Sequence, residues 1–206
     1  MSFQSGATRE TFLRIGQAGD NIYIDLGNDK WQCVEVNAGG WQVLDKAPVS
    51  FRRTAKMKAL PMPQRCTDIN AALIEFWELI NIAQEDRILV LAWLLAAMRA
   101  QGPYPIIALL AEAGSAKTTT AKALKRLVSP YVAETRSRPK TVEDVYVAAN
   151  NDWLLIYDNL SSIPQDISDA FCRLSTGGGY ATRELYENLE EVATDQQRPL
   201  IINVVS

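Results

Sequence analysis

The sequence has 206 residues, of which 48% are hydrophobic and 22% charged, a composition typical of a globular chain that can bury a sizeable core. The formal net charge of −3 excludes a uniformly basic protein, so any contact with nucleic acid must come from a local patch or a pore between subunits. The chain has no histidine, which excludes imidazole metal sites and His-based catalytic triads.

Cysteine usage and hydropathy indicate the compartment. Cys33, Cys66 and Cys172 are far apart and show no C-x-x-C spacing, which argues against a zinc site or disulfide framework and fits a reducing cytoplasm. The amino end has no signal-peptide pattern, and the longest apolar run, residues 88–98, is too short to cross a bilayer. We therefore expect a cytoplasmic protein without a membrane partner.

Residues 1–64 are expected to form a small β-rich region. Alternating apolar and polar residues, with an Asn/Gly-rich turn at 37–40, predict a hairpin in which Trp31 and Trp41 form a hydrophobic cross-strand pair rather than a base-stacking platform. The predicted strands are residues 21–27, 31–36 and 41–44, with an edge strand over 48–53.

A local basic group lies at the end of this region. It is interpreted as a solvated face, and contact with a nucleic-acid backbone is the less favoured interpretation. The two prolines of residues 60–63 mark a boundary, so that residues 65–206 form a second unit. The basic group consists of Arg52, Arg53, Lys56 and Lys58.

Two helices are predicted after the boundary. The first is capped by Thr67 or Asp68 and has apolar residues at helical spacing, which predicts a core-facing stripe. The second, from about residue 84 to 100, contains the long apolar run and is expected to be buried on most sides. The stripe consists of Ile69, Ala72, Leu73, Phe76, Trp77 and Ile80.

Strands and helices alternate through the rest of the chain, which predicts an α/β fold with a parallel sheet and flanking helices. In such folds ligands bind at the carboxyl ends of the strands. A Gly-rich break precedes a hairpin over residues 180–194. The predicted strands are residues 106–110, 153–158 and 198–205, and the predicted helices are residues 118–127, 141–150 and 167–175.

The segment after residue 110 has the layout of a phosphate-binding loop: strand, small residues, Lys117-Thr118, helix. In such loops backbone amides and a helix N-terminus bind phosphate, the lysine approaches the β/γ-phosphates, and the threonine hydroxyl binds Mg²⁺. Ala111 and Ala116 replace the two glycines of the pattern G-x-x-x-x-G-K-[ST]. The residues expected to bind nucleotide are Ala113, Gly114, Ser115, Ala116, Lys117, Thr118 and Thr119.

Two polar residues on later strands support this interpretation. Asp158 ends one apolar strand and Asn203 lies within another, so both are expected at the same sheet edge as the loop. Asp158 is expected to hold Mg²⁺ together with Thr118, and Asn203 to position water or contact the γ-phosphate. Taken singly, each residue also fits a turn or capping role.

These segments resemble the ATPase domain of replication proteins encoded by phages and mobile elements, within the AAA+ and superfamily-3 helicase-like class of P-loop NTPases. The resemblance implies an AAA+/RecA-like parallel sheet, with Lys117 and Thr118 as the Walker A pair, Asp158 as the Walker B acid and Asn203 as the sensor-1 residue. The segments that resemble this family are residues 111–119, 153–161, 172–186 and 197–203.

The same resemblance implies partners and cofactors. ATP and Mg²⁺ would bind at the loop, identical subunits would form a ring, and the hairpin of residues 180–194 would lie where this class contacts single- or double-stranded DNA. An arginine acting in trans is also expected in such a ring, and Arg183 and Arg198 are the candidates, although each also fits a plain surface charge.

Two departures from the family pattern bear on hydrolysis. The usual Walker B glutamate, a general base, is replaced by Asn159, so Asp158 itself or Glu112 would have to assist. The family's last strand, lid and arginine finger would follow Asn203, so the sequence is expected to be truncated after the sensor-1 strand.

The expected function is ATP binding and hydrolysis in a DNA replication or helicase-type protein of a phage or mobile element. The alternative is a nucleotide-gated binding or scaffold module with little hydrolysis, favoured by Ala111, Ala116 and Asn159. A small-molecule kinase is a weaker alternative because no lid or acceptor-pocket signature is present. A GTPase is disfavoured because the sequence has no N-K-x-D motif.

Overall fold

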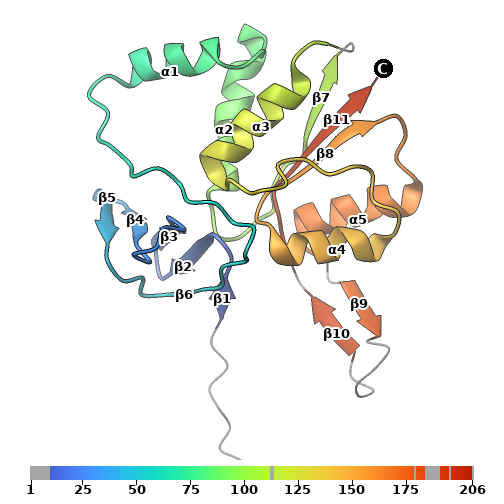
Figure 1. Cartoon of the computed structure of the whole chain (residues 1–206), viewed down its shortest axis with the longest axis horizontal. Coiled ribbons are helices and arrows are strands. Elements are labelled where there is room, and N and C mark those ends of the chain that lie inside the picture. The colour runs from blue at the N-terminus through green and yellow to red at the C-terminus, as the bar shows by residue number, and fades with distance from the viewer. Residues whose placement is uncertain (1–9, 112–113, 179, 184–190, 195, 206) are drawn as a thin grey trace, which may run out of the picture.

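The computed structural model describes residues 10–111, 114–178, 180–183, 191–194 and 196–205. Figure 1 shows the amino-terminal strands on one side of the molecule and a parallel sheet with flanking helices on the other. The α-helices of the described residues are α1 (Ile69–Glu78), α2 (Arg87–Ala97), α3 (Lys117–Val128), α4 (Val142–Asn151) and α5 (Gln165–Thr176), with a short 3₁₀-helix, η1 (Gln84–Asp86), before α2.

Three parallel strands form the central sheet, in the order β7 (Ile107–Ala111), β11 (Leu200–Val205), β8 (Leu155–Leu160). The last strand in the sequence therefore lies between the other two. A single parallel bridge joins Arg136 to Tyr157 at the outer edge of β8. The prediction of an α/β fold with parallel strands is confirmed.

Helices cover both faces of this sheet because successive side chains of a buried strand point to opposite faces. One face of β8 and β11 packs with α2 and α3, and the other packs with α4 and α5, which gives three layers. The first face presents Leu154, Ile156 and Ile201, and the second presents Leu155, Tyr157 and Leu200.

The amino-terminal region forms a four-stranded antiparallel sheet of β2 (Ile15–Ala18), β3 (Asn21–Asp25), β4 (Cys33–Asn37) and β5 (Gly40–Leu44), so the sheets of the chain are of mixed type. The expected tryptophan pair is wrong: Trp41 pairs with Val36, and Trp31 precedes β4 with a φ of 59°. The expected edge strand shortens to β6 (Ser50–Phe51), which pairs in parallel with β1 (Thr11–Phe12).

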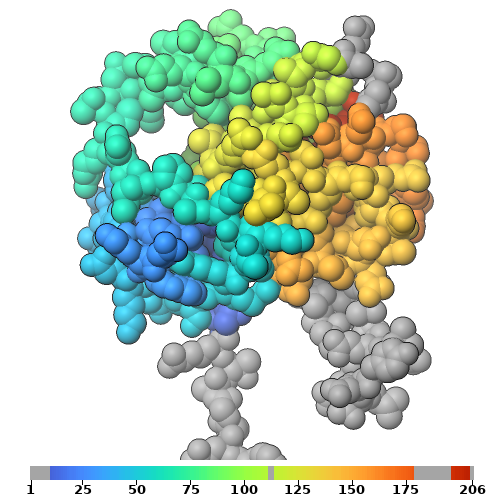
Figure 2. Space-filling view, in the orientation of Figure 1, coloured from blue at the N-terminus to red at the C-terminus, as the bar shows by residue number. Residues whose placement is uncertain are grey.

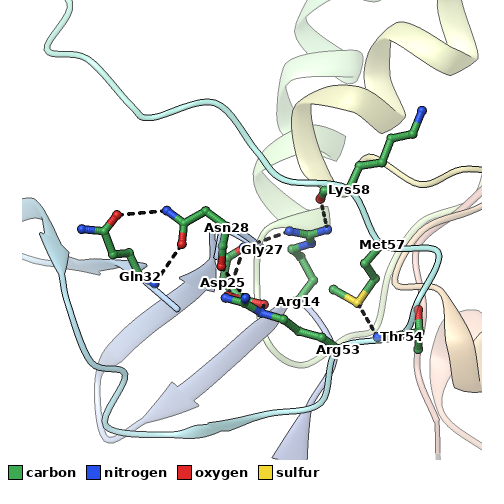
Figure 3. Close-up of polar contacts among 9 residues, drawn as sticks. All are labelled: Arg14, Asp25, Gly27, Asn28, Gln32, Arg53, Thr54, Met57 and Lys58. Carbon is green, nitrogen blue, oxygen red and sulfur yellow. Dashed lines mark hydrogen bonds and ion pairs between the residues drawn. The ribbon is translucent and has the colours of Figure 1, made fainter. Parts of the chain in front are cut away.

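The strap, residues 52–60, leaves β6 and is fastened to the amino-terminal sheet by two arginines (Figure 3). Buried Arg14 donates from Nη1 to the carbonyl oxygen of Asp25 at 2.9 Å and from Nη2 to that of Lys58 at 2.7 Å. Burial lowers the pKa of Arg14 to about 10. Arg53 forms an ion pair with Asp25 at 2.6 Å, so this member of the basic group has a structural role rather than a solvated one.

The predicted helices before β7 form, but their exposure differs from expectation. Asp68 caps α1 by accepting from the amides of Asn70 and Ala71, as predicted. The core-facing stripe forms in part: Ile69 is 67% exposed, whereas Phe76 and Trp77 pack against the core and Ile80, just after the helix, is buried. In α2, Ile88, Leu89 and Leu95 are about as exposed as Ile69, so burial on most sides is wrong: only one face of this helix meets the core.

A buried polar cluster joins α3 to the start of β8. Lys125 and Asp152 are almost wholly inaccessible to solvent, and their ion pair has an Nζ–Oδ2 distance of 2.8 Å. Lys125 also donates to the carbonyl oxygen of Leu154, and Arg136 reaches Asp152 at 3.3 Å. Burial lowers the pKa of Lys125, which Asp152 opposes by stabilising the charged form.

The predicted hairpin forms from β9 (Tyr180–Arg183) and β10 (Glu191–Thr194), which pair antiparallel with Arg183 opposite Glu191. Figure 1 shows the two strands beyond α4 and α5, away from the parallel sheet. The part of the predicted hairpin between the two strands, residues 184–190, lies outside the described residues.

Candidate nucleotide site

The strand order brings three sequence-predicted residues together at the carboxyl edge of the parallel sheet. Thr118 is the second residue of α3, Asp158 lies in β8, and Asn203 lies in β11 between β7 and β8. Thr118 and Asn203 approach the same carboxylate from two elements that are far apart in the sequence. Their proximity was predicted; their roles remain predictions.

Asp158 is the hub of this arrangement. Its Oδ2 accepts from the Thr118 hydroxyl at 2.9 Å, and its Oδ1 lies 3.1 Å from the same hydroxyl. The same Oδ1 accepts a hydrogen bond from Asn203 Nδ2 at 2.7 Å and another from the backbone amide of Asn159 at 3.0 Å. All of these donors are neutral, so they orient the carboxylate without compensating its charge.

A bulge in β8 creates this geometry. Ile202 pairs with Tyr157 and Val204 with Leu160, so both Asp158 and Asn159 lie opposite Asn203. Asn159 has a left-handed φ of 63°, a conformation that asparagine tolerates better than most residues. The backbone therefore favours asparagine at this position over the glutamate that the resemblance leads one to expect.

The side-chain amide of Asn203 has a defined orientation. Only Nδ2 can donate to a carboxylate, so Oδ1 must point away from Asp158. That Oδ1 atom is buried and has no hydrogen-bond partner among the described residues. A buried acceptor without a partner is costly, and a donor or a cation from a ligand would satisfy it.

The predicted phosphate-binding loop is described from Gly114 onward, whereas Glu112 and Ala113 lie outside the described residues. Gly114 has a φ of 84°, and Ala116, the N-cap of α3, has a φ of 62°. Ala116 thus adopts the left-handed conformation of the glycine it replaces, at a cost of about 1–2 kcal/mol. Lys117 follows as the first residue of α3.

Asn81 supports the loop and was not predicted from the sequence. Its side-chain Nδ2 donates to the carbonyl oxygen of Ser115 at 3.0 Å, and its backbone amide donates to Thr120 Oγ1 at 3.2 Å. The contact joins residues more than 30 positions apart, and no local pattern around Asn81 indicates it.

The two arginines proposed to act in trans lie away from this edge. Arg198 precedes β11, about 16 Å along the strand from Asn203 at 3.3 Å per residue. It donates to the carbonyl oxygens of Ala149 and Gln197, and burial lowers its pKa to about 10. Arg183 is in β9, and its side chain lies outside the described structure. Neither belongs to its own chain's Asp158 cluster within the described residues.

The donor set fits Mg²⁺ bound together with phosphates. Mg²⁺ prefers oxygen ligands and is usually held by one or two carboxylates plus substrate phosphates. Thr118 supplies a hydroxyl and Asp158 a carboxylate, and the two groups lie 2.9 Å apart. Across the described ranges no group of three or more His, Cys, Asp or Glu residues is placed to hold a metal, so the chain offers no all-protein cage there.

Comparison with known proteins now defines the family. Residues 73–206, nearly two thirds of the chain, match a family model described as actinomycete integrative conjugative element replication protein. The chain therefore belongs to this family of mobile-element replication proteins, as the resemblance to such proteins predicted. No curated protein and no solved structure matches the chain. In the part of the chain described, no helix has the length and apolarity needed to cross a membrane.

Proposed function

We propose that this replication protein binds and hydrolyses ATP with Mg²⁺ at the edge formed by Thr118, Asp158 and Asn203. The observation that carries the proposal is the Asp158 carboxylate, oriented by two side chains beside the N-terminus of α3. Phosphates favour the positive end of a helix, and a carboxylate with neutral partners favours a cation. Both preferences meet at this edge.

Each residue has a definite task in this proposal. The amides of residues 114–118 and Lys117 bind the phosphates, while Thr118 and Asp158 hold Mg²⁺, whose positive charge would offset that of the phosphates. Asn203 Oδ1, the buried acceptor without a described partner, accepts a hydrogen bond from the attacking water. The resemblance also supports a ring of subunits that contacts DNA through the hairpin of β9 and β10.

A second candidate is nucleotide-gated binding with little hydrolysis, and the position of Asn159 favours it. Asparagine cannot accept a proton from water. A glutamate at position 159 could do so, but the left-handed backbone there disfavours it. Asp158 is left as the described carboxylate that contacts Thr118, at the start of the loop helix.

Calorimetry with ATP·Mg²⁺ tests the proposal. The wild-type chain should bind, and Lys117→Ala should weaken binding at least about tenfold, because charge-assisted contacts to phosphate contribute about 1.5–3 kcal/mol. Lys122→Ala, on the same helix, is the matched control and should bind normally. Equal affinity of the wild type and Lys117→Ala would show that the nucleotide does not bind here.

Turnover measured on the same preparations, with and without single-stranded DNA, separates the two candidates. Hydrolysis that Asp158→Asn abolishes supports the ATPase. Mg²⁺-dependent binding without turnover, in the presence of DNA as well, supports nucleotide-gated binding.

A further inference from the structure

A cavity of about 710 Å³ lies beside the outer edge of β8, on the α4 side of the sheet. Its walls are the strap, the loop of residues 131–140 and the exposed side of α4. Figure 2 shows the blue-green strap meeting the yellow loop and helix on the viewed face. The volume is within the range of about 300–1,000 Å³ typical of ligand sites.

Hydrogen bonds fix two walls of the cavity. The amide of Val132 donates to the carbonyl oxygen of Lys56 at 2.9 Å, and Thr54 Oγ1 donates to that of Asn151 at 3.2 Å. The strap is itself held by Arg14 and Arg53 (Figure 3). The cavity is therefore built into the fold.

The lining is strongly positive although the chain as a whole is negative. Among the described residues, Lys56, Arg138 and Lys140 form no ion pair, and all three are exposed. The single lining carboxylate, Asp144, accepts from the amides of Lys140 and Thr141 in the capping box of α4. These hydrogen bonds lower the pKa of Asp144.

Two further donors of the lining have no hydrogen-bond partner among the described residues. They are the hydroxyl of Tyr157 and Nε of Arg136, two buried atoms of residues that line the cavity. Burial raises the pKa of Tyr157, so its hydroxyl remains protonated and can donate. Nη2 of Arg136 forms an ion pair with Asp152, which holds this side chain in place.

We propose that this cavity binds the phosphate backbone of a nucleic-acid strand. Clustered cations and orphan donors in a concave, prebuilt site favour a polyanion. The rings of Tyr131 and Tyr157 are buried, and Tyr157 stacks on Phe171, so neither offers a free face to a base. Binding is therefore directed at phosphates and is independent of base sequence.

This site is separate from the proposed nucleotide site, so its test omits ATP. Fluorescence anisotropy would follow a labelled single-stranded DNA oligonucleotide across a series of salt concentrations. The triple variant Lys56→Ala, Arg138→Ala, Lys140→Ala should bind roughly 10- to 100-fold more weakly at low salt. The slope of log K against log salt should become shallower by about 2, since each lost single-strand contact contributes about 0.7.

A charge-matched variant is the control. Lys30→Ala, Lys46→Ala, Arg65→Ala removes three exposed cations outside the cavity and should affect binding much less. An equal loss in both triple variants would show that only net charge matters and would overturn the proposal. Failure of the wild-type chain to bind the oligonucleotide would overturn it as well. The proposal would also be overturned if inorganic phosphate displaced the oligonucleotide at a concentration equal to that of the oligonucleotide's own phosphate groups.

Tyr157→Phe separates binding from folding. It removes the unpartnered hydroxyl but retains the ring that stacks on Phe171. DNA binding should weaken by about three- to tenfold. The free energy of unfolding should stay equal or rise, because the substitution removes a buried hydroxyl that has no described partner. Unchanged DNA affinity would exclude the hydroxyl from the site and contradict the proposed mode of binding.

Discussion

One aspartate precedes β8 and another lies within it, and their surroundings differ in kind. Asp152, before the strand, is buried and paired with the cations Lys125 and Arg136. Asp158, near its carboxyl end, accepts from neutral donors and is partly exposed. A buried carboxylate compensated by the chain's own cations stabilises the fold, whereas an oriented carboxylate with neutral partners favours an external cation.

The largest effect is expected from Lys125→Ala. The substitution leaves Asp152 buried with Arg136 as its remaining cation, so the free energy of unfolding should fall by about 3–5 kcal/mol. Urea denaturation followed by circular dichroism measures it. Lys122→Ala, one turn earlier on α3, should change the free energy by less than about 0.5 kcal/mol. Similar losses in the two variants would refute the structural role of the buried pair.

Asp158→Asn should have the opposite profile. The side chain keeps its shape, so the free energy of unfolding without ligand should change by less than about 1 kcal/mol. The stabilisation by ATP·Mg²⁺, about 2.7 kcal/mol at a hundredfold excess over Kd, should be lost. Thermal unfolding with and without ATP·Mg²⁺ measures both quantities. If Asp158→Asn unfolds as readily as Lys125→Ala, the two aspartates do not differ as described.

Ala116→Gly tests the backbone at the start of α3. Glycine adopts the left-handed conformation without steric cost, so this variant should be more stable by up to about 1 kcal/mol. Ala123→Gly, inside the same helix, should be less stable by about 1 kcal/mol. Chemical denaturation of the two variants compares them, and a loss of stability in both would contradict the left-handed geometry of Ala116.

Glu35 gives the smallest expected effect and extends the comparison to a third carboxylate. Hydrogen bonds from Gln42, Tyr23 and Asn21 lower the pKa of Glu35. At a pH just below the ordinary pKa of glutamate, the folded state therefore binds fewer protons than the unfolded state. The stability from these bonds is complete above pH of about 4.3 and declines as the pH falls through the lowered pKa. Glu35→Gln should therefore reduce the acid sensitivity of unfolding, measured as denaturation midpoint against pH.

Local patterns predicted the elements that depend on neighbouring residues. Apolar runs predicted β7, β8 and β11, and the capping residue Asp68 predicted the start of α1. The proximity of Asp158 and Asn203 also followed from sequence, because parallel strands share a carboxyl edge.

Properties that depend on distant partners were not predictable. Helical spacing identifies the apolar face of α1 but does not indicate that Phe76 and Trp77 pack against the core while Ile69 stays exposed. Lys125 and Arg14 resemble surface cations in the sequence, and their acceptors lie up to 116 residues away. The bulge at Asp158 and Asn159 depends on the register with β11, which no pattern within β8 specifies.

The long reach of Arg14 has a consequence for the order of folding during synthesis. Its guanidinium contacts Ser129 and Pro130, residues translated on the order of ten seconds later at about 5–20 residues per second. Until they emerge, a nascent amino-terminal sheet that enclosed this charge would lack two of the acceptors of Arg14, while Asp25 and Lys58 already supply the other two. The amino-terminal sheet should therefore reach its final packing on the ribosome only after α3 has formed, although its strands are made first.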